Sequence, residues 1–217
     1  GLARFPKVFK VINQFERFFV FDLEDYHRYR YQHPNLLSCS NFYFDIPEES
    51  IPVNKNEVLY VGVYIKSRIE SLLKITKKLS ENQALTLNIN LFIGRKKNPF
   101  HYPHITFFSE GLNYAQYLTL TKKAAILLDI KTVEHSGLSF RIFEAIKYGK
   151  KLITDNVSVK QYDFYHPNNF FVFENDNWDT LDDFLKSEYV PISEEIKQKY
   201  SFSNWVKYVL GFESGSE

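Results

Sequence analysis

Short apolar runs alternate with helical patterns from Glu57 to about residue 175, and this alternation constrains the fold more than any other feature. The compact run Val58–Gly62 is followed by a helical pattern through Leu79 and then by a second apolar run, Leu87–Ile93. A strand, a helix and a strand in this order predict parallel strands joined by a right-handed crossover. The sequence therefore predicts an α/β fold, a Rossmann-like doubly wound parallel sheet. Its further strands are expected at 105–108, 125–130, 151–154 and 170–173, and further helices at 114–123 and 139–148.

The segments on either side of this alternation predict smaller parts. Val8, Val11, Ile12 and Phe15 recur at helical spacing, so residues 6–17 predict an amphipathic helix. A strand at 17–21, a helix capped by Asp22 and an extended segment at 36–44 are expected to follow it. The expected domains are a short N-terminal α/β part at 1–45, a proline-containing linker at 46–56, the Rossmann-like domain at 57–192, and C-terminal helices at 193–217, one of them capped by Ser203. We expect these C-terminal helices to pack back on the N-terminal part.

Composition narrows the class of protein. The 27 basic and 26 acidic residues give a net charge of +1, which argues against nucleic acid or an anionic membrane as the main partner. No run of about 18 apolar residues is present, so we expect a cytoplasmic protein with at most peripheral contact at the inner face of a membrane. Cys39 is the single cysteine, which excludes an internal disulfide framework. The 21 Phe and 15 Tyr residues predict apolar faces that could also mediate a homo-oligomer.

The turn after the predicted strand at 125–130 carries the richest set of polar groups. Gly137 lets the backbone come close to a ligand, and Ser139 can cap the following helix, whose first amides suit a phosphate. Arg141 lies in the first turn, where a guanidinium can bind a diphosphate in bidentate fashion. Glu144 lies on the same helical face, where a carboxylate can accept two ribose hydroxyl protons. The alternative is an ordinary capped and solvated helix.

The stretch HSGLSFRIFEAIKYGKKLITDN, His135 to Asn156, resembles the donor-binding helix and the following strand of GT-B glycosyltransferases. It is most similar to the bacterial group of lipopolysaccharide or surface polysaccharide synthesis. Phe21–Tyr26 (FDLEDY) resembles that group's FDxxD segment at the end of the acceptor-side domain, and the tail from Phe184 resembles its C-terminal helices. The resemblance implies the GT-B C-terminal domain with a short remnant of the acceptor-side domain at 1–45.

The resemblance also implies roles for single residues. The donor would be a nucleoside diphosphate sugar, and the acceptor a saccharide or a lipid-linked saccharide. Glu144 would hold the ribose hydroxyls, and Arg141 would stabilise the departing diphosphate as the catalytic cation. The diphosphate would bind the amides of Gly137, Leu138 and Ser139, with Gly62 and Lys66 near the phosphates and Phe107 beside the base. Arg68 or Arg95 would add positive charge, and no metal or other cofactor is implied.

Two points stay open from the sequence. Retaining enzymes of this fold carry a second acid eight residues before the ribose glutamate, and that position is Ser136 here, with Glu134 as the nearest substitute. The stereochemical outcome is therefore undecided. The second candidate function is a non-catalytic Rossmann-like module for nucleotide binding or assembly. A dinucleotide oxidoreductase is excluded, because no GxGxxG follows the strand at 58–62. The HxxH pair His101 and His104 is too small a ligand set to predict a metal.

Overall fold

The computed structural model describes residue 2 and residues 5–47, 51–95, 101–132, 137–174 and 177–212. Its centre is a six-stranded parallel sheet with the strand order β5-β4-β3-β6-β7-β8. This order confirms the predicted doubly wound α/β fold, because the chain winds outward in both directions from the central pair β3 and β6. The strands are β3 (Asn54–Val63), β4 (Thr86–Phe92), β5 (Ile105–Phe108), β6 (Ala124–Asp129), β7 (Lys151–Thr154) and β8 (Phe170–Val172).

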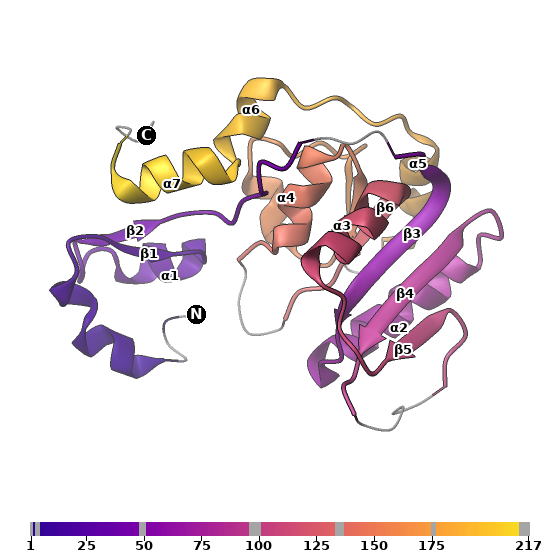
Figure 1. Ribbon diagram of the computed structural model, residues 1–217, viewed down its shortest axis with the longest axis horizontal. Coiled ribbons are helices and arrows are strands. Elements are labelled where there is room, and N and C mark those ends of the chain that lie inside the picture. Colours follow the sequence, from indigo (N-terminus) through magenta and orange to yellow (C-terminus); the bar gives the residue numbers. More distant parts are fainter. Residues whose placement is uncertain are drawn as a thin grey trace.

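Two hydrophobic cores lie on the two faces of this sheet, because successive side chains of a strand point to opposite sides. Leu59 and Leu127 belong to the core under α4 (Phe140–Lys147), and their strand neighbours belong to the core under α2 (Lys66–Ser80). Figure 1 shows α3 (Tyr114–Lys123) and α4 on one side of the sheet and α2 on the other. Both faces are covered, which explains why β6 is apolar at every position except its last residue, Asp129.

The N-terminal part is a small separate unit. It contains the two-stranded parallel sheet of β1 (Phe18–Val20) and β2 (Leu36–Ser38), with α1 (Leu23–Tyr29) between them in sequence. The predicted helix over 6–17 is wrong: the segment forms two 3₁₀ turns, Pro6–Lys10 and Ile12–Gln14, and Ile12 is its one buried residue. A helix this short is marginal without tertiary contacts, and a single buried side chain supplies few of them.

The C-terminal helices α6 (Glu194–Lys199) and α7 (Phe202–Leu210) follow α5 (Leu181–Lys186) and lead back to the N-terminal unit (Figure 1). Tyr208 Oη donates a hydrogen bond to the carbonyl of Ser38 at 3.0 Å. Ser201 caps α7 by accepting from the amide of Asn204, so the prediction of Ser203 as the cap is wrong. Ser203 instead donates to Asp45 through both its amide and its hydroxyl. Among the described residues, no helix has the length and hydropathy needed to cross a bilayer.

Candidate functional site

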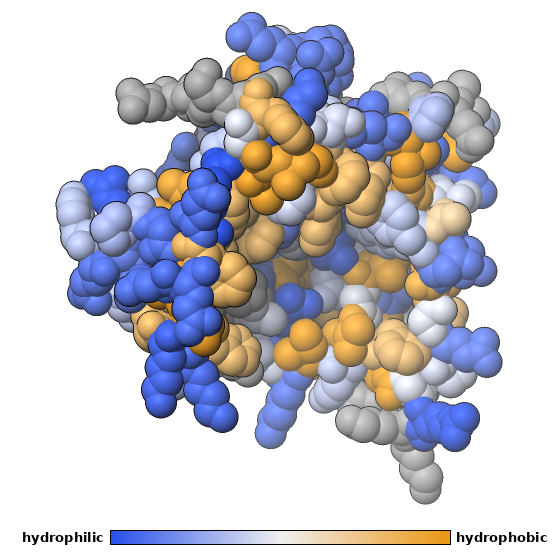
Figure 2. Space-filling view, turned by 60° about the vertical axis from the view of Figure 1, so that its left-hand side comes forward, coloured by the Kyte–Doolittle hydropathy of each residue, from blue (hydrophilic) through white to orange (hydrophobic). Residues whose placement is uncertain are grey.

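Two adjoining cavities open at the carboxyl ends of β3 and β6, the place where open α/β sheets bind ligands. The Glu144 cavity has a volume of about 490 Å³ and also contains Tyr114, Tyr117 and Arg141. The Phe21 cavity has a volume of about 500 Å³ and lies between β1 and the loop before α4. Four residues line both cavities: Arg68, Asp129, Ser139 and Phe140. A hollow with hydrophobic side chains along its rim is visible on the face shown in Figure 2.

Asp129, the last residue of β6, is the centre of a buried polar network. Its side chain accepts hydrogen bonds from Ser139 Oγ at 2.7 Å, Arg141 Nη1 at 3.2 Å and Thr154 Oγ1 at 3.2 Å. The residue is 2% exposed, and three donors satisfy its carboxylate. Asp129 therefore fixes the start of α4 relative to the ends of β6 and β7.

Arg141 lines the Glu144 cavity but its two terminal nitrogens are bound to protein acceptors. Nη1 pairs with Asp129, Nη2 donates to the carbonyl of Val61 in β3, and the guanidinium lies 4.9 Å from the ring centre of Tyr60. Burial by itself would lower the pKa of Arg141, and the charges of Tyr117 and Asp129 raise it above the usual value. The cation is therefore present at the cavity wall, with Nε as its buried nitrogen that has no partner among the described residues.

Glu144 is 2% exposed and its carboxylate faces the cavity that bears its name. Tyr114 Oη donates to Oε1 at 3.1 Å, and Tyr117 Oη donates to Oε2 at 2.5 Å. Burial raises the pKa of Glu144, while these two hydrogen bonds and the charge of Arg141 act in the opposite direction. The structure thus places the Glu144 carboxylate at the cavity wall with one hydroxyl donor on each oxygen, and its role towards a ribose stays a prediction.

The start of α4 lies between the two cavities. Ser139 occupies the N-cap position, but its hydroxyl donates to Asp129 and makes no cap bond, so the prediction that it caps the helix is wrong. A Cβ at Gly137 would lie 3.0 Å from the carbonyl oxygen of Phe21, so this glycine permits contact with the N-terminal unit. Asn41 Nδ2 donates to the carbonyl of Leu138 at 2.7 Å across the same boundary. The positive end of α4 therefore has no side-chain cap where the cavities meet.

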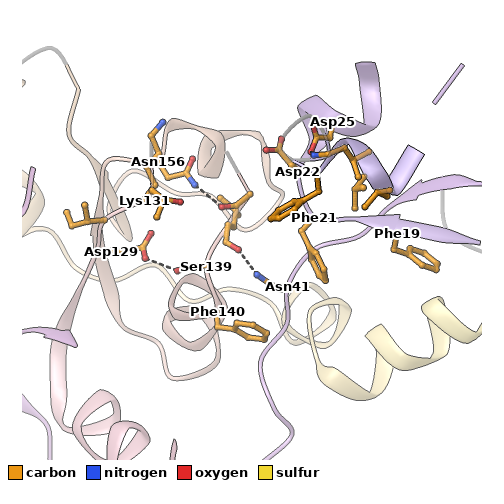
Figure 3. A pocket seen from close by; sticks show the side chains of 18 of the residues that line it. Phe19, Phe21, Asp22, Asp25, Asn41, Asp129, Lys131, Ser139, Phe140 and Asn156 are labelled. Atoms are coloured by element: carbon orange, nitrogen blue, oxygen red, sulfur yellow. Dashed lines mark hydrogen bonds between the residues drawn. The ribbon is translucent and has the colours of Figure 1, made fainter. Parts of the chain in front are cut away.

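The Phe21 cavity has two chemically different walls. Figure 3 shows Phe19, Phe21, Asp22 and Asp25 on the side of the N-terminal unit. The opposite wall, formed by the sheet edge and α4, carries Asp129, Lys131, Ser139, Phe140 and Asn156. The wall of the N-terminal unit is thus mainly aromatic and aliphatic with two acids, Asp22 and Asp25, and the opposite wall mixes polar side chains with Phe140.

Some predicted site residues lie elsewhere. Gly62, Lys66 and Phe107 are absent from the linings of both cavities. A Cβ at Gly62 would lie 2.8 Å from Tyr60 Oη, so this glycine makes room for the ring beside Arg141. Lys66 is the exposed first residue of α2, and Phe107 packs against the core on the α2 face. Arg95 is exposed after β4. Glu134 and Ser136 lie outside the described residues.

The sequence reasoning missed three residues of the site. Asp129 ends an apolar strand, and an acid at that position is the signal that could have identified it. Tyr114 and Tyr117 are spaced to share a helical face, but nothing local indicates that this face meets Glu144, 27 residues further along the chain from Tyr117. Arg68, predicted as added charge, lines both cavities, and its buried Nε has no partner among the described residues.

Comparison with known proteins bears on the fold. No protein-family model and no curated protein matches the sequence. The crystal structure of TarM matches with a TM-score of 0.64 and 14% sequence identity, over 96% of this chain and 46% of the TarM chain. A mutant of S. aureus TarM in complex with Fondaparinux, alpha-GlcNAc-glycerol and UDP matches with a TM-score of 0.63 and 11% identity over the same shares. The chain thus spans less than half the length of these solved chains. Its fold is the Rossmann-like α/β fold of a GT-B C-terminal domain.

Proposed function

We propose that this chain is the donor-binding part of a GT-B-type glycosyltransferase that acts in bacterial envelope polysaccharide synthesis, such as that of lipopolysaccharide. The enzyme would transfer a sugar from a nucleoside diphosphate sugar to a saccharide acceptor. The bond from the anomeric carbon to the diphosphate breaks, the acceptor oxygen bonds to that carbon, and the acceptor proton passes to a base. Residues 1–45 would belong to the acceptor-side domain, and the reaction would take place at the cytoplasmic face of a membrane.

The observation that carries this proposal is the pair of adjoining cavities at the point where the strand order reverses. The Glu144 cavity offers a buried carboxylate for hydroxyl groups, and the uncapped start of α4 with Arg68 and Arg141 offers positive charge for a diphosphate. The Phe21 cavity lies beyond that charge, where an acceptor would meet the sugar. TarM, whose fold this chain shares, is a GT-B glycosyltransferase, and one of its structures contains UDP.

Calorimetric titration with UDP, GDP, ADP and CMP tests the donor site. We expect one of these nucleotides to bind and Glu144→Gln to weaken it about tenfold or more, because a hydrogen bond to a charged group contributes roughly 1.5–3 kcal/mol. Glu110→Gln, at an exposed position, is the matched control and should leave the affinity unchanged. The proposal fails if the wild-type chain binds none of the four, or if Glu144→Gln binds as well as the wild type.

A non-catalytic module for nucleotide binding or assembly is the second candidate. It is favoured by the contacts of Arg141, whose two terminal nitrogens already donate to Asp129 and to the carbonyl of Val61. The two candidates differ in turnover. Release of nucleoside diphosphate from the sugar donor that binds, followed by NMR with a saccharide acceptor, supports the enzyme if it is lost in Arg141→Ala. Release that is unchanged in Arg141→Ala contradicts the catalytic role predicted for this residue.

A further inference from the structure

Both carboxylate oxygens of Glu144 already accept a hydrogen bond from the same helix. The donors Tyr114 and Tyr117 lie in the first turn of α3. A capping box fixes that turn: Asn113 Oδ1 accepts from the amide of Gln116 at 2.9 Å, and the amide of Asn113 donates to Gln116 Oε1 at 3.0 Å. Two phenolic hydroxyls thus sit on the carboxylate in the way that two hydroxyls of a ligand would sit.

The two tyrosines differ in how firmly they are held on the Glu144 carboxylate. Tyr114 is 40% exposed, its hydrogen bond is the longer one, and its ring meets the half-exposed Phe44 edge-on at 5.4 Å. Tyr117 is half-buried and makes the shorter bond. Of the two, the more exposed Tyr114 with the longer bond is therefore the easier to displace from the carboxylate.

We propose that the hydroxyl of Tyr114 occupies the place on Glu144 Oε1 that a ribose hydroxyl takes, and that nucleotide binding displaces it. Tyr117 is then a positioning residue that keeps Oε2 bound and the carboxylate oriented. This inference rests on the proposed donor site. It implies that the free energy of nucleotide binding includes the cost of breaking the hydrogen bond from Tyr114 to Glu144. It also implies that Tyr114 keeps this bond to Oε1 when the matching ribose hydroxyl is missing.

A thermodynamic cycle with UDP and its 2′-deoxy and 3′-deoxy analogues tests the exchange by calorimetry, with GDP or ADP analogues if the nucleotide panel selects those. We expect Tyr114→Phe to bind UDP roughly two- to tenfold more tightly than the wild type, because no protein bond has to be broken. One deoxy analogue should lose little affinity in the wild type, since Tyr114 again satisfies Glu144. In Tyr114→Phe the same analogue leaves a buried carboxylate oxygen without a partner. The loss of affinity from UDP to this analogue should therefore be about tenfold larger in Tyr114→Phe than in the wild type.

Two variants provide the controls. Tyr117→Phe should lower the affinity for UDP, because Glu144 loses its fixed orientation. This change is opposite in sign to the increase expected for Tyr114→Phe. Tyr31→Phe, at a residue 80% exposed in the N-terminal unit, should change neither the affinity nor the ratio between UDP and its analogues. The exchange is ruled out if Tyr114→Phe weakens UDP binding or leaves that ratio as in the wild type, while UDP still binds the wild type and Glu144→Gln still weakens this binding. Absence of all nucleotide binding in wild type and variants refutes the donor site itself.

Discussion

Glu144 is a carboxylate in surroundings that penalise its charge. Burial raises its pKa above the ordinary value for glutamate, which is about 4.3 in an unfolded chain. A group whose pKa is higher in the folded state binds its proton more tightly there, so it stabilises the fold at low pH. That contribution is complete below the unfolded pKa and is lost as the pH rises through the folded pKa. The charged form of Glu144, which suits hydroxyl binding, thus lowers the unfolding free energy at neutral pH relative to the protonated form.

Substitution of Glu144 by Gln removes this titration while keeping the size of the side chain. We expect the unfolding free energy of Glu144→Gln, measured relative to the wild type by urea denaturation, to increase from about pH 4 towards neutrality. Asp155, whose pKa burial also raises, titrates in both proteins and cancels in the difference. Glu110→Gln, at an exposed position, is the control for the loss of one carboxyl group. A flat or falling difference for Glu144→Gln would contradict the assignment.

At the scale of elements, the Asp129 network joins four of them. Asp129 ends β6, Ser139 and Arg141 begin α4, Thr154 ends β7, and Arg141 extends the network to Val61 of β3. The candidate site therefore depends on a buried ion pair that fixes the cavity wall. Breaking one partner of such a pair leaves an uncompensated charge, which is costlier than removing both.

Asp129→Ala should lower the unfolding free energy by about 3–5 kcal/mol, because Arg141 keeps its buried charge and loses its counterion. The double variant Asp129→Ala with Arg141→Met should be more stable than Asp129→Ala alone. Glu174→Gln breaks the Lys160–Glu174 pair, whose side chains are 42% and 38% exposed, and should cost less than about 1 kcal/mol. Urea denaturation of the four proteins measures these differences. Equal costs for the buried and the exposed pair would contradict this account of the network.

The sequence predicts those elements whose burial produces a local pattern of apolar residues. The run 125–130 is apolar except for Asp129, and the structure has β6 at that place, because a strand covered on both faces needs no polar residues. The apolar residues over 6–17 have the spacing of an amphipathic helix, but the folded chain buries Ile12 alone in this segment. The network of Asp129 and the tyrosines at Glu144 could not be predicted, since those contacts join residues of different elements and leave no periodic pattern.

At the scale of the whole molecule, the N-terminal unit depends on the C-terminal helices. Its own core contains four buried residues, Leu2, Ile12, Val20 and Leu36, under a sheet of two strands. A two-stranded sheet is marginal by itself, so its attachment decides its stability. Helix α7 provides that attachment: Tyr208 bonds the carbonyl of Ser38, Ser203 bonds Asp45, and Arg17 Nη1 donates to the carbonyl of Val209 at 3.0 Å.

Removal of α7 should therefore loosen the N-terminal unit while the six-stranded sheet stays folded. In a chain that ends at Ser201, which keeps the buried Tyr200, we expect amide hydrogen exchange over residues 18–38 to speed up at least about tenfold. Peptides from β3 and β6 should exchange as in the full chain, because their cores contain no residue of α7. A chain that ends at Phe212 keeps the helix and is the control. Unchanged protection of residues 18–38 in the chain ending at Ser201 would mean that the unit is stable without α7, and that its contacts with Gly137 and Leu138 suffice to hold it beside the cavities.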